Sequence, residues 1–280
     1  MKSALVTGAS SGIGEATALR LLQEGYRVYA AARRLDRMAA LEAAGARLLA
    51  LDLTDDASIV AAVELIREDG GRLDALINNA GYGAYGALED VPLAEARRQM
   101  EVNLFGQARL IQLLLPLMRS QKKGRIVNVT SVGGKFGEPF GSWYHASKFA
   151  LEGLSDCLRM ELAPLGIKVI VVEPGAIKTE WGGIAGASLL AASGQGPYAP
   201  WAVPHGKVLS SVEALADFAS PPEVVARTIA RALRSWRPRT RYATGGRAKT
   251  FMAMNWLLSD RLKDRLSANA FRNYAKKAAV

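Results

Sequence analysis

The sequence predicts an α/β fold in which a doubly wound parallel sheet carries helices on both faces. Short apolar runs alternate with longer helical patterns from the N-terminus to Val172, and this alternation favours a parallel sheet. The runs contain few polar positions, which is typical of strands buried on both faces. Glycines follow the helical patterns, where they commonly end helices: Gly25, Gly45, Gly71 and Gly166.

Each element is assigned by its residue range. Strands are expected at Ser3–Thr7, Arg27–Ala32, Arg47–Leu51, Ala75–Asn78, Arg125–Thr130 and Lys168–Val172. Helices are expected at residues 13–25, 36–44, 55–68, 93–121 and 143–163. The chain has 280 residues, of which 50% are hydrophobic, so it is long enough to bury this sheet in one large domain.

The pattern changes after Pro174. Residues 176–220 are rich in Gly, Ala and Ser and are interpreted as a mobile flap, because long segments of this kind often serve function. The stretch Ser220–Glu223 (Ser-Pro-Pro-Glu) predicts a helix that starts with a capping box and runs to about Trp236. A last short strand is expected at Arg239–Ala243.

The C-terminal part of the chain carries the excess charge. The net charge is +10, from 36 basic and 26 acidic residues, and the segment from Arg231 to Val280 holds 13 basic and 2 acidic residues. From Lys249 onward, apolar residues recur at helical spacing, which predicts an amphipathic helix. We therefore expect a main domain over residues 1–248 and a basic helical extension over residues 249–280.

Composition excludes several classes of site. Cys157 is the only cysteine, and His145 and His205 are the only histidines, which excludes an internal disulfide, a cysteine-based zinc cluster and a three-histidine metal site. No metal is therefore expected. No apolar run approaches the ~18 residues that span a bilayer, and the N-terminal apolar stretch is too short for a secretory signal. These features favour a reducing, cytoplasmic setting.

A glycine-rich loop predicts a phosphate site. Thr7–Gly14 (TGASSGIG) directly follows the first strand and opens the first helix. Glycines there let the backbone approach a pyrophosphate, whose charge is stabilised by the helix N-terminus. The spacing differs from the common dinucleotide fingerprint, and a tight strand-to-helix turn is the alternative interpretation.

The end of the second strand discriminates between cofactors. An NAD site usually places an acid about 20 residues after the glycines, whereas here Arg33 and Arg34 follow the strand and no acid stands before Asp36. Two guanidinium groups can hold a 2′-phosphate by charge-assisted, bidentate hydrogen bonds. This favours NADP(H) over NAD(H); a solvated arginine pair is the alternative.

Ser131, Tyr144 and Lys148 predict acid–base chemistry. Tyr144 and Lys148 are four residues apart on one expected helix and share a face, and Ser131 follows an expected strand. A cation ~5 Å from a phenol lowers its pKa by about 2 at an effective dielectric of about 20, which brings it closer to working pH. Taken alone, such a Tyr–Lys pair is usually a pair of surface neighbours, and His145 beside it is expected on the helix surface.

Six motifs together resemble those of the short-chain dehydrogenase/reductase family. They are, in chain order, Thr7–Gly14, Asn78-Asn-Ala-Gly81, Asn103 in Val-Asn-Leu, Ser131, the Tyr144/Lys148 pair and Pro174-Gly175. The resemblance is close over residues 1–180 and loose beyond them. It implies a Rossmann-type fold and an NADP-preferring branch similar to 17β-hydroxysteroid and retinol dehydrogenases and carbonyl reductases.

The resemblance also implies roles for these positions. Tyr144 would be the general acid or base, Lys148 would hold the nicotinamide ribose and lower the pKa of Tyr144, and Ser131 would bind the substrate oxygen. Asn103 would hold a water of the proton relay. The residues expected around NADP(H) are Gly8, Ser10, Ser11, Gly12, Ile13, Gly14, Arg33, Arg34, Asp52, Leu53, Asn79, Ala80, Gly81, Tyr144, Lys148, Pro174, Gly175, Ile177 and Thr179.

Aromatic side chains stand where the substrate is expected. They belong to segments that should converge above the nicotinamide, at the carboxyl ends of the strands. Some of these aromatic side chains are expected only to pack within the flap. The others indicate that the substrate is a bulky apolar ketone or alcohol. The residues expected to contact substrate are Tyr82, Tyr85, Phe136, Phe140 and Trp181.

The predicted function is NADPH-dependent reduction of a ketone or aldehyde to an alcohol, reversible as an alcohol dehydrogenase. A non-catalytic NADP sensor on the same fold is one alternative, and peripheral membrane attachment through residues 249–277 is an additional possibility. The basic charge raises nucleic-acid binding as a hypothesis, but the sequence contains no known nucleic-acid-binding motif. We therefore expect no nucleic-acid partner. The family resemblance implies a homodimer or homotetramer, formed through the helices near 93–121 and 143–163, with Leu110, Leu114, Leu151 and Leu154 on their apolar faces.

Overall fold

The computed structural model describes residues 1–211 and 218–278, with side chains through residue 269 and that of Arg272. Within these residues, seven parallel strands form one sheet in the order β3-β2-β1-β4-β5-β6-β7. Every expected strand is present, with ends that differ by two residues at most. The strands are β1 (Ser3–Thr7), β2 (Arg27–Ala32), β3 (Arg47–Ala50), β4 (Ala75–Asn78), β5 (Gly124–Val129), β6 (Ile167–Pro174) and β7 (Arg241–Thr244).

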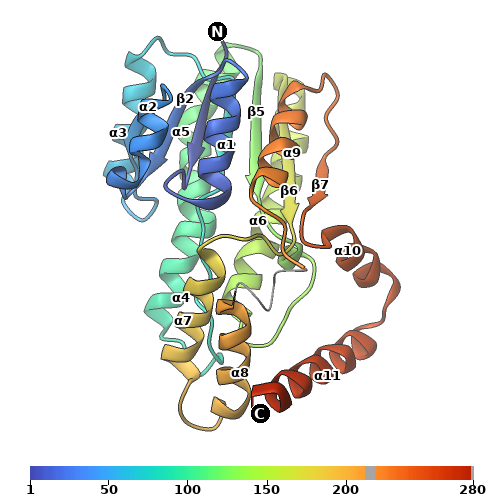
Figure 1. Ribbon diagram of the computed structural model, residues 1–280. Helices are drawn as coiled ribbons and strands as arrows, with labels where there is room; N and C mark the ends of the chain where they lie inside the picture. The colour runs from blue at the N-terminus through green and yellow to red at the C-terminus, as the bar shows by residue number, and fades with distance from the viewer. Residues whose placement is uncertain (212–217, 279–280) are drawn as a thin grey trace.

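Helices cover both faces of this sheet (Figure 1). In β1, Ala4 and Val6 point into one core and Leu5 into the other, because successive side chains of a strand alternate. The doubly wound Rossmann-type fold is thereby confirmed. One face carries α1 (Gly12–Gln23), α2 (Ala39–Ala43) and α9 (Glu223–Arg234), and the other carries α3 (Asp56–Glu68), α5 (Gly106–Ser120) and α6 (Ser142–Leu162).

The long helix expected at residues 93–121 is interrupted. It consists of α4 (Leu93–Met100), a π-helical turn at Glu101–Phe105, and α5. Such turns are frequent at functional sites. This one contains Asn103, whose side chain is fully buried.

The part of residues 176–220 that the structure describes is largely helical, and its role as a mobile flap stays a prediction. α7 (Trp181–Ser193) and α8 (Ala199–Ser210) pack against each other as a helical pair. A Cβ atom on Gly186 would lie only 2.6 Å from the carbonyl oxygen of Gly206, so the small residues of this segment serve close helix packing. Residues 212–217 of the expected flap lie outside the described residues.

The capping box predicted at Ser220 is wrong. α9 begins at Glu223 after Pro222 and has no side-chain cap. The Ser220 hydroxyl instead accepts a hydrogen bond from the amide of Gly246, at 2.9 Å. It thereby joins the segment before α9 to the turn after β7.

Two helices replace the single amphipathic helix expected from Lys249. They are α10 (Ala248–Leu257) and α11 (Asp260–Ala278), separated by Leu258 in an extended conformation. Residues 279–280 of the expected extension lie outside the described residues. In Figure 1, α7, α8, α10 and α11 all lie beyond the carboxyl ends of the strands. None of the helices in the described part of the chain is both long and apolar enough to cross a membrane.

Most of the leucines expected at a subunit interface are used inside the chain. Leu110, Leu114 and Leu151 are buried in the monomer, and Leu154 is half-buried. The expectation that they face a second subunit is therefore wrong for the three buried leucines. The exposed large apolar residues on these helices and the π-helical turn are Leu93, Phe105, Phe149 and Met160.

Candidate active site

A cleft of about 600 Å³ runs across the carboxyl ends of the strands. It begins at the loop between β1 and α1, passes the ends of β4, β5 and β6, and reaches the helices beyond the sheet. Almost all residues expected at the cofactor line this cleft, as do Ser131 and four of the five expected substrate residues. Gly14, Asn103 and Phe140 are not among its lining residues.

The loop between β1 and α1 forms a cradle of bare backbone. Gly8 and Gly12 have φ values of +66° and +58°, a conformation that side chains rarely adopt. A Cβ atom on Gly14 would lie 2.1 Å from the carbonyl oxygen of Gly8. Ser11 precedes α1 without a side-chain cap, which leaves the first amides of the helix available to an anion. The loop therefore fits a dinucleotide pyrophosphate.

Asn79 and Thr7 fasten the next loop to this cradle. The Thr7 hydroxyl accepts hydrogen bonds from the amides of Asn79 and Ala80, both at 3.0 Å, and Asn79 Nδ2 donates to the Thr7 carbonyl at 2.9 Å. The Asn-Asn-Ala-Gly turn is thus a structural clamp between the ends of β1 and β4. Its backbone forms part of the cleft wall.

Charged residues gather where the adenine end of a dinucleotide would lie. Arg33 and Arg34 are exposed and line the cleft. Arg34 Nη2 lies 3.3 Å from Ser10 Oγ and 3.4 Å from Glu180 Oε2. Although burial acts in the opposite direction, hydrogen bonds from Thr54 and the charge of Arg33 hold the pKa of Asp52 below its usual value. This end fits a phosphorylated ribose, because Arg33 has no ion pair to a carboxylate in the described chain.

Ser131 and Tyr144 meet at the end of β5. Ser131 begins a short 3-10 turn (Val132–Gly134) and its hydroxyl accepts a hydrogen bond from the amide of Gly133. Burial raises the pKa of Tyr144 to about 12, while a hydrogen bond with Ser131 acts in the opposite direction. Loss of water around the phenol outweighs this hydrogen bond, and the lowering of the Tyr144 pKa that the resemblance implies for Lys148 stays a prediction.

Lys148 and Asn103 are both buried near the backbone of Gly81. Lys148 is 4% exposed, and its Nζ donates to the carbonyl oxygen of Val129 at 3.0 Å. Burial lowers the pKa of Lys148 to about 8, against the opposing charge of Glu152. Asn103 exchanges hydrogen bonds with the backbone of Tyr82 and donates to Ser147. A Cβ atom on Gly81 would lie 3.1 Å from Asn103 Oδ1 and 3.5 Å from Lys148 Nζ, so these two side chains flank one backbone position.

Aromatic rings surround the Tyr144 phenol. Its ring centroid lies 5.0 Å from that of Trp181 and 5.9 Å from that of Tyr85, and both neighbours line the cleft. Phe140, which is also expected to contact substrate, packs against the cluster that contains Tyr85 and Tyr144 but is not among the residues that line the cleft, so its substrate role stays a prediction. Its ring packs against Tyr198 and His205, at 6.3 and 6.1 Å.

Sequence reasoning missed two groups beside the phenol. His145 was expected on the helix surface, but it is 6% exposed, and its Nδ1 lies 2.8 Å from the Gly133 carbonyl. Glu138 lines the cleft and accepts a hydrogen bond from the Tyr85 hydroxyl at 2.6 Å. Burial favours the neutral acid, but hydrogen bonding to His145 and Tyr85 nevertheless lowers the pKa of Glu138. No motif marked Glu138; only its place between Ser131 and Tyr144 could have indicated it.

The C-terminal extension also reaches the cleft. Phe251 of α10 and Ser267 of α11 are lining residues. The Phe251 ring lies 5.7 Å from that of Phe136 and 5.5 Å from that of Phe218. The sequence predicts that Phe251 lies on the apolar face of a helix, but it does not predict that this ring contacts Phe136 and Phe218.

The comparison with known families agrees with this geometry. The family model described as short chain dehydrogenase matches residues 2–185. The chain belongs to the short-chain dehydrogenase family. Its matched segment contains the glycine loop, Ser131, Tyr144 and Lys148.

Individual members of the short-chain dehydrogenase family resemble this chain to different extents. The 3-ketodihydrosphingosine reductase of Bacteroides thetaiotaomicron is 43% identical, over 62% of this chain and 64% of its own length; this chain thus spans less than two thirds of that relative. The NADPH-dependent 3-dehydrocapnine reductase of Ornithobacterium rhinotracheale is 34% identical, over 95% of this chain and 96% of its own. A solved short-chain dehydrogenase from Streptomyces avermitilis is 34% identical, covers 95% of both chains and has a TM-score of 0.77.

Proposed function

We propose that this short-chain dehydrogenase catalyses the NADPH-dependent reduction of a ketone or aldehyde to an alcohol. The observation that carries the proposal is the convergence of Ser131, Tyr144 and Lys148 at one end of a cleft whose other end is the bare glycine loop. When bound, NADPH supplies the hydride. The chain supplies the proton, the binding of the oxygen and the shape of the site.

In this mechanism Tyr144 acts as the general acid. A pKa of about 12 keeps the phenol protonated at neutral pH, so it can donate its proton to the carbonyl oxygen as negative charge develops there. The Ser131 hydroxyl donates a hydrogen bond to the same oxygen. The cationic form of Lys148 stabilises the tyrosinate that results.

The preference for NADPH rests on Arg33 and Arg34. Arg34 already contacts Glu180, whereas Arg33 lines the cleft and faces the Asp52 side of the adenine end. We therefore assign the 2′-phosphate chiefly to Arg33. The relative whose name states NADPH dependence supports this preference.

The substrate is proposed to be a bulky apolar carbonyl compound. Trp181, Leu209, Phe218 and Phe251 line the far part of the cleft. Two relatives named as reductases of a 3-keto and a 3-dehydro compound support carbonyl reduction. Because apolar side chains tolerate many shapes, the wall indicates the size and polarity of the substrate but not its identity.

The decisive experiment measures NADPH oxidation across ketones, aldehydes, 3-oxoacyl thioesters and steroids. Tyr144→Phe removes only the hydroxyl, and we expect it to reduce kcat by at least about a hundredfold while NADPH still binds. A non-catalytic NADP sensor is the second candidate. It would bind NADPH equally well, but turn over no member of the panel and lose nothing in Tyr144→Phe.

Two further assignments follow from exposed apolar side chains. We propose a homodimer or homotetramer in which Phe105 and Phe149 contact a second subunit, since they are 53% and 47% exposed. Trp256, at 84% exposed, and Leu257, at 68%, project from the basic extension, and we propose peripheral contact with an anionic membrane there. A cytoplasmic location is proposed from the single cysteine.

A further inference from the structure

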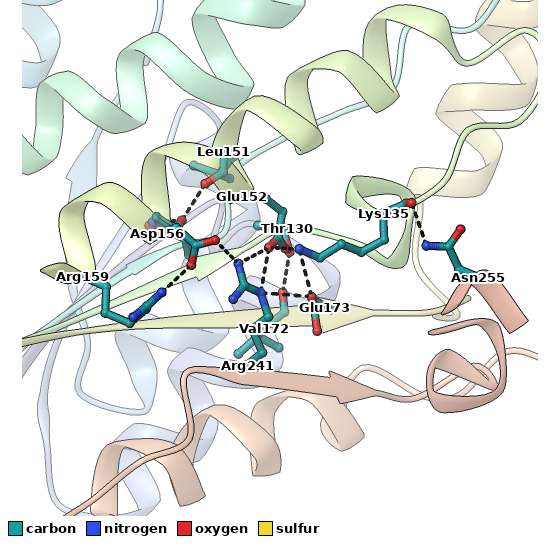
Figure 2. A network of polar contacts seen from close by, with 12 residues as sticks. Thr130, Lys135, Leu151, Glu152, Asp156, Arg159, Val172, Glu173, Arg241 and Asn255 are labelled. Carbon is teal, nitrogen blue, oxygen red and sulfur yellow. Dashed lines mark hydrogen bonds and ion pairs between the residues drawn. The ribbon is translucent and has the colours of Figure 1, made fainter. Parts of the chain in front are cut away.

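A cluster of charges with two buried carboxylates lies one helical turn beyond Lys148, centred on Glu152 (Figure 2). The Thr130 hydroxyl donates to Glu152 Oε1 at 2.7 Å, and Glu152 Oε2 lies 2.6 Å from Lys135 Nζ and 3.0 Å from Arg241 Nε. The Glu152 side chain is 5% exposed. Each carboxylate oxygen of Glu152 therefore has a partner, and none of the three partners belongs to α6.

Glu173 and Asp156 complete this cluster. Glu173 Oε1 on β6 lies 3.6 Å from Arg241 Nε and 3.8 Å from Lys135 Nζ, so it shares both cations with Glu152. Burial and the charge of Glu152 raise the pKa of Glu173 to about 7. Asp156, one turn further along α6, pairs with Arg241 at 2.7 Å and with Arg159 at 2.8 Å. The cluster thus holds the Glu152 carboxylate in one position.

In this position Glu152 is linked to the segment around Ser131 and lies on the same helix as Lys148. Thr130 directly precedes Ser131, and Lys135 ends the turn that Ser131 begins. The carbonyl oxygen of Lys135 also accepts a hydrogen bond from Asn255 of α10, at 3.0 Å. On α6, Glu152 is the one described charge that opposes the effect of burial on Lys148.

We propose that Glu152 is a positioning residue, which fixes Ser131 through Thr130 and places a negative charge one helical turn from Lys148. The proposal rests on the proposed function, because it presumes that Ser131 and Lys148 act on a carbonyl. Without the carboxylate, burial favours the neutral amine over a wider range of pH. The titratable groups that face Lys148 and Glu152 are Tyr144 and Asp156 on α6, Lys135 after the 3-10 turn, Glu173 on β6 and Arg241 on β7.

Glu152→Gln separates the charge from the hydrogen bond. The glutamine oxygen still accepts from Thr130, but the negative charge beside Lys148 is gone. We expect the alkaline midpoint of the kcat–pH profile to move down by about one pH unit or more, with kcat at pH 6 within about threefold of the wild type. Asp156→Asn is the matched control: it removes a charge from the same cluster one turn farther away, and should keep the wild-type midpoint.

Thr130→Val tests the hydrogen bond to Glu152 separately from the charge of Glu152. It removes the hydroxyl that holds Glu152 but keeps the charge. We expect an unchanged alkaline midpoint and a kcat lowered about three- to tenfold, because Ser131 is less well positioned. The KM for NADPH should not change, since the glycine loop is untouched.

Each outcome of these experiments either supports or overturns the role proposed for Glu152 or the proposed function. An unchanged midpoint in Glu152→Gln, or a wild-type kcat in Thr130→Val, overturns the proposal even if Tyr144→Phe is inactive. An active Tyr144→Phe overturns the proposed function instead. If circular dichroism shows that Glu152→Gln does not fold, Glu152→Asp replaces it: the charge stays but no longer reaches Thr130, so a lowered kcat with the wild-type midpoint is expected and a wild-type kcat contradicts the role.

Discussion

The floor and the roof of the cleft are held by different forces. The floor consists of the loops at the strand ends, residues 7–14, 79–81 and 130–135, which are joined by short hydrogen bonds and by the Glu152 ion pairs. The roof consists of α7, α8 and α10, whose contacts with the cleft are mainly apolar and aromatic. The floor carries the proposed chemistry, and the roof carries the proposed substrate contacts.

This difference has a physical consequence. A buried polar group that loses its partner costs about 1–3 kcal/mol, so the floor admits one arrangement only. Apolar side chains can exchange neighbours of similar volume at a smaller cost. We therefore expect changes in the floor to lower cofactor binding or turnover, and changes in the roof to alter which substrates are accepted.

Gly14→Ala should have the largest effect, because it forces a methyl group against the floor. The new Cβ would lie 2.1 Å from the carbonyl oxygen of Gly8, so the backbone must shift. We expect the free energy of unfolding to fall by about 1–3 kcal/mol and NADPH affinity to fall at least about tenfold, measured by chemical denaturation and by fluorescence titration. Gly153→Ala is the control: its Cβ meets nothing within 4 Å, and it should be neutral or stabilise by about 0.5–1 kcal/mol.

Arg33→Ala tests how the end of β2, beside the floor, selects the cofactor. Loss of a charge-assisted hydrogen bond should lower the preference for NADPH over NADH about tenfold or more, seen in the ratio of kcat/KM for the two cofactors. Arg37→Ala is the matched control, since Arg37 pairs with Glu180 at 2.7 Å and does not line the cleft. An unchanged ratio in Arg33→Ala would contradict the assignment of the 2′-phosphate.

Phe251→Ala tests the roof. Removing this ring widens the cleft beside Phe136 and Phe218, so the KM for bulky ketones should rise about three- to tenfold. The kcat for a small aldehyde should change little, because the floor is intact. Met254→Ala, on the same helix but outside the cleft lining, should leave both values unchanged. An equal loss for small and large substrates would show that the roof and the floor act as one unit.

We expect the smallest effect from Trp256→Ser, which changes an exposed residue of α10 in the roof. We expect co-sedimentation with anionic vesicles to fall about threefold, because an exposed aromatic anchor is lost. Trp236→Ser is the control, since Trp236 is 75% exposed but lies between α9 and β7. Equal losses in both variants, or none in either, would exclude a specific role for the extension.

The floor could be predicted from the sequence more completely than the roof. Thr7–Gly14, Asn79 and Ser131 stand at the ends of strands, and a parallel sheet brings such ends together whatever the loops do. The roof depends on helix packing between segments without a motif. The helical pair of α7 and α8 could therefore not be predicted from its Gly- and Ala-rich sequence, nor could the packing of Phe140 against Tyr198 and His205.

The strands, the glycine cradle and the set of Ser131, Tyr144 and Lys148 could be recognised in the sequence, because periodicity and local backbone requirements depend on neighbouring residues. The ionisation of that set depends on the folded structure. Burial raises the pKa of Tyr144 and lowers that of Lys148, and the charge of Glu152 opposes the second effect. Contacts with three residues outside α6 hold that carboxylate in place. Electrostatic energy depends on distance and on loss of water, and neither follows from spacing along the chain.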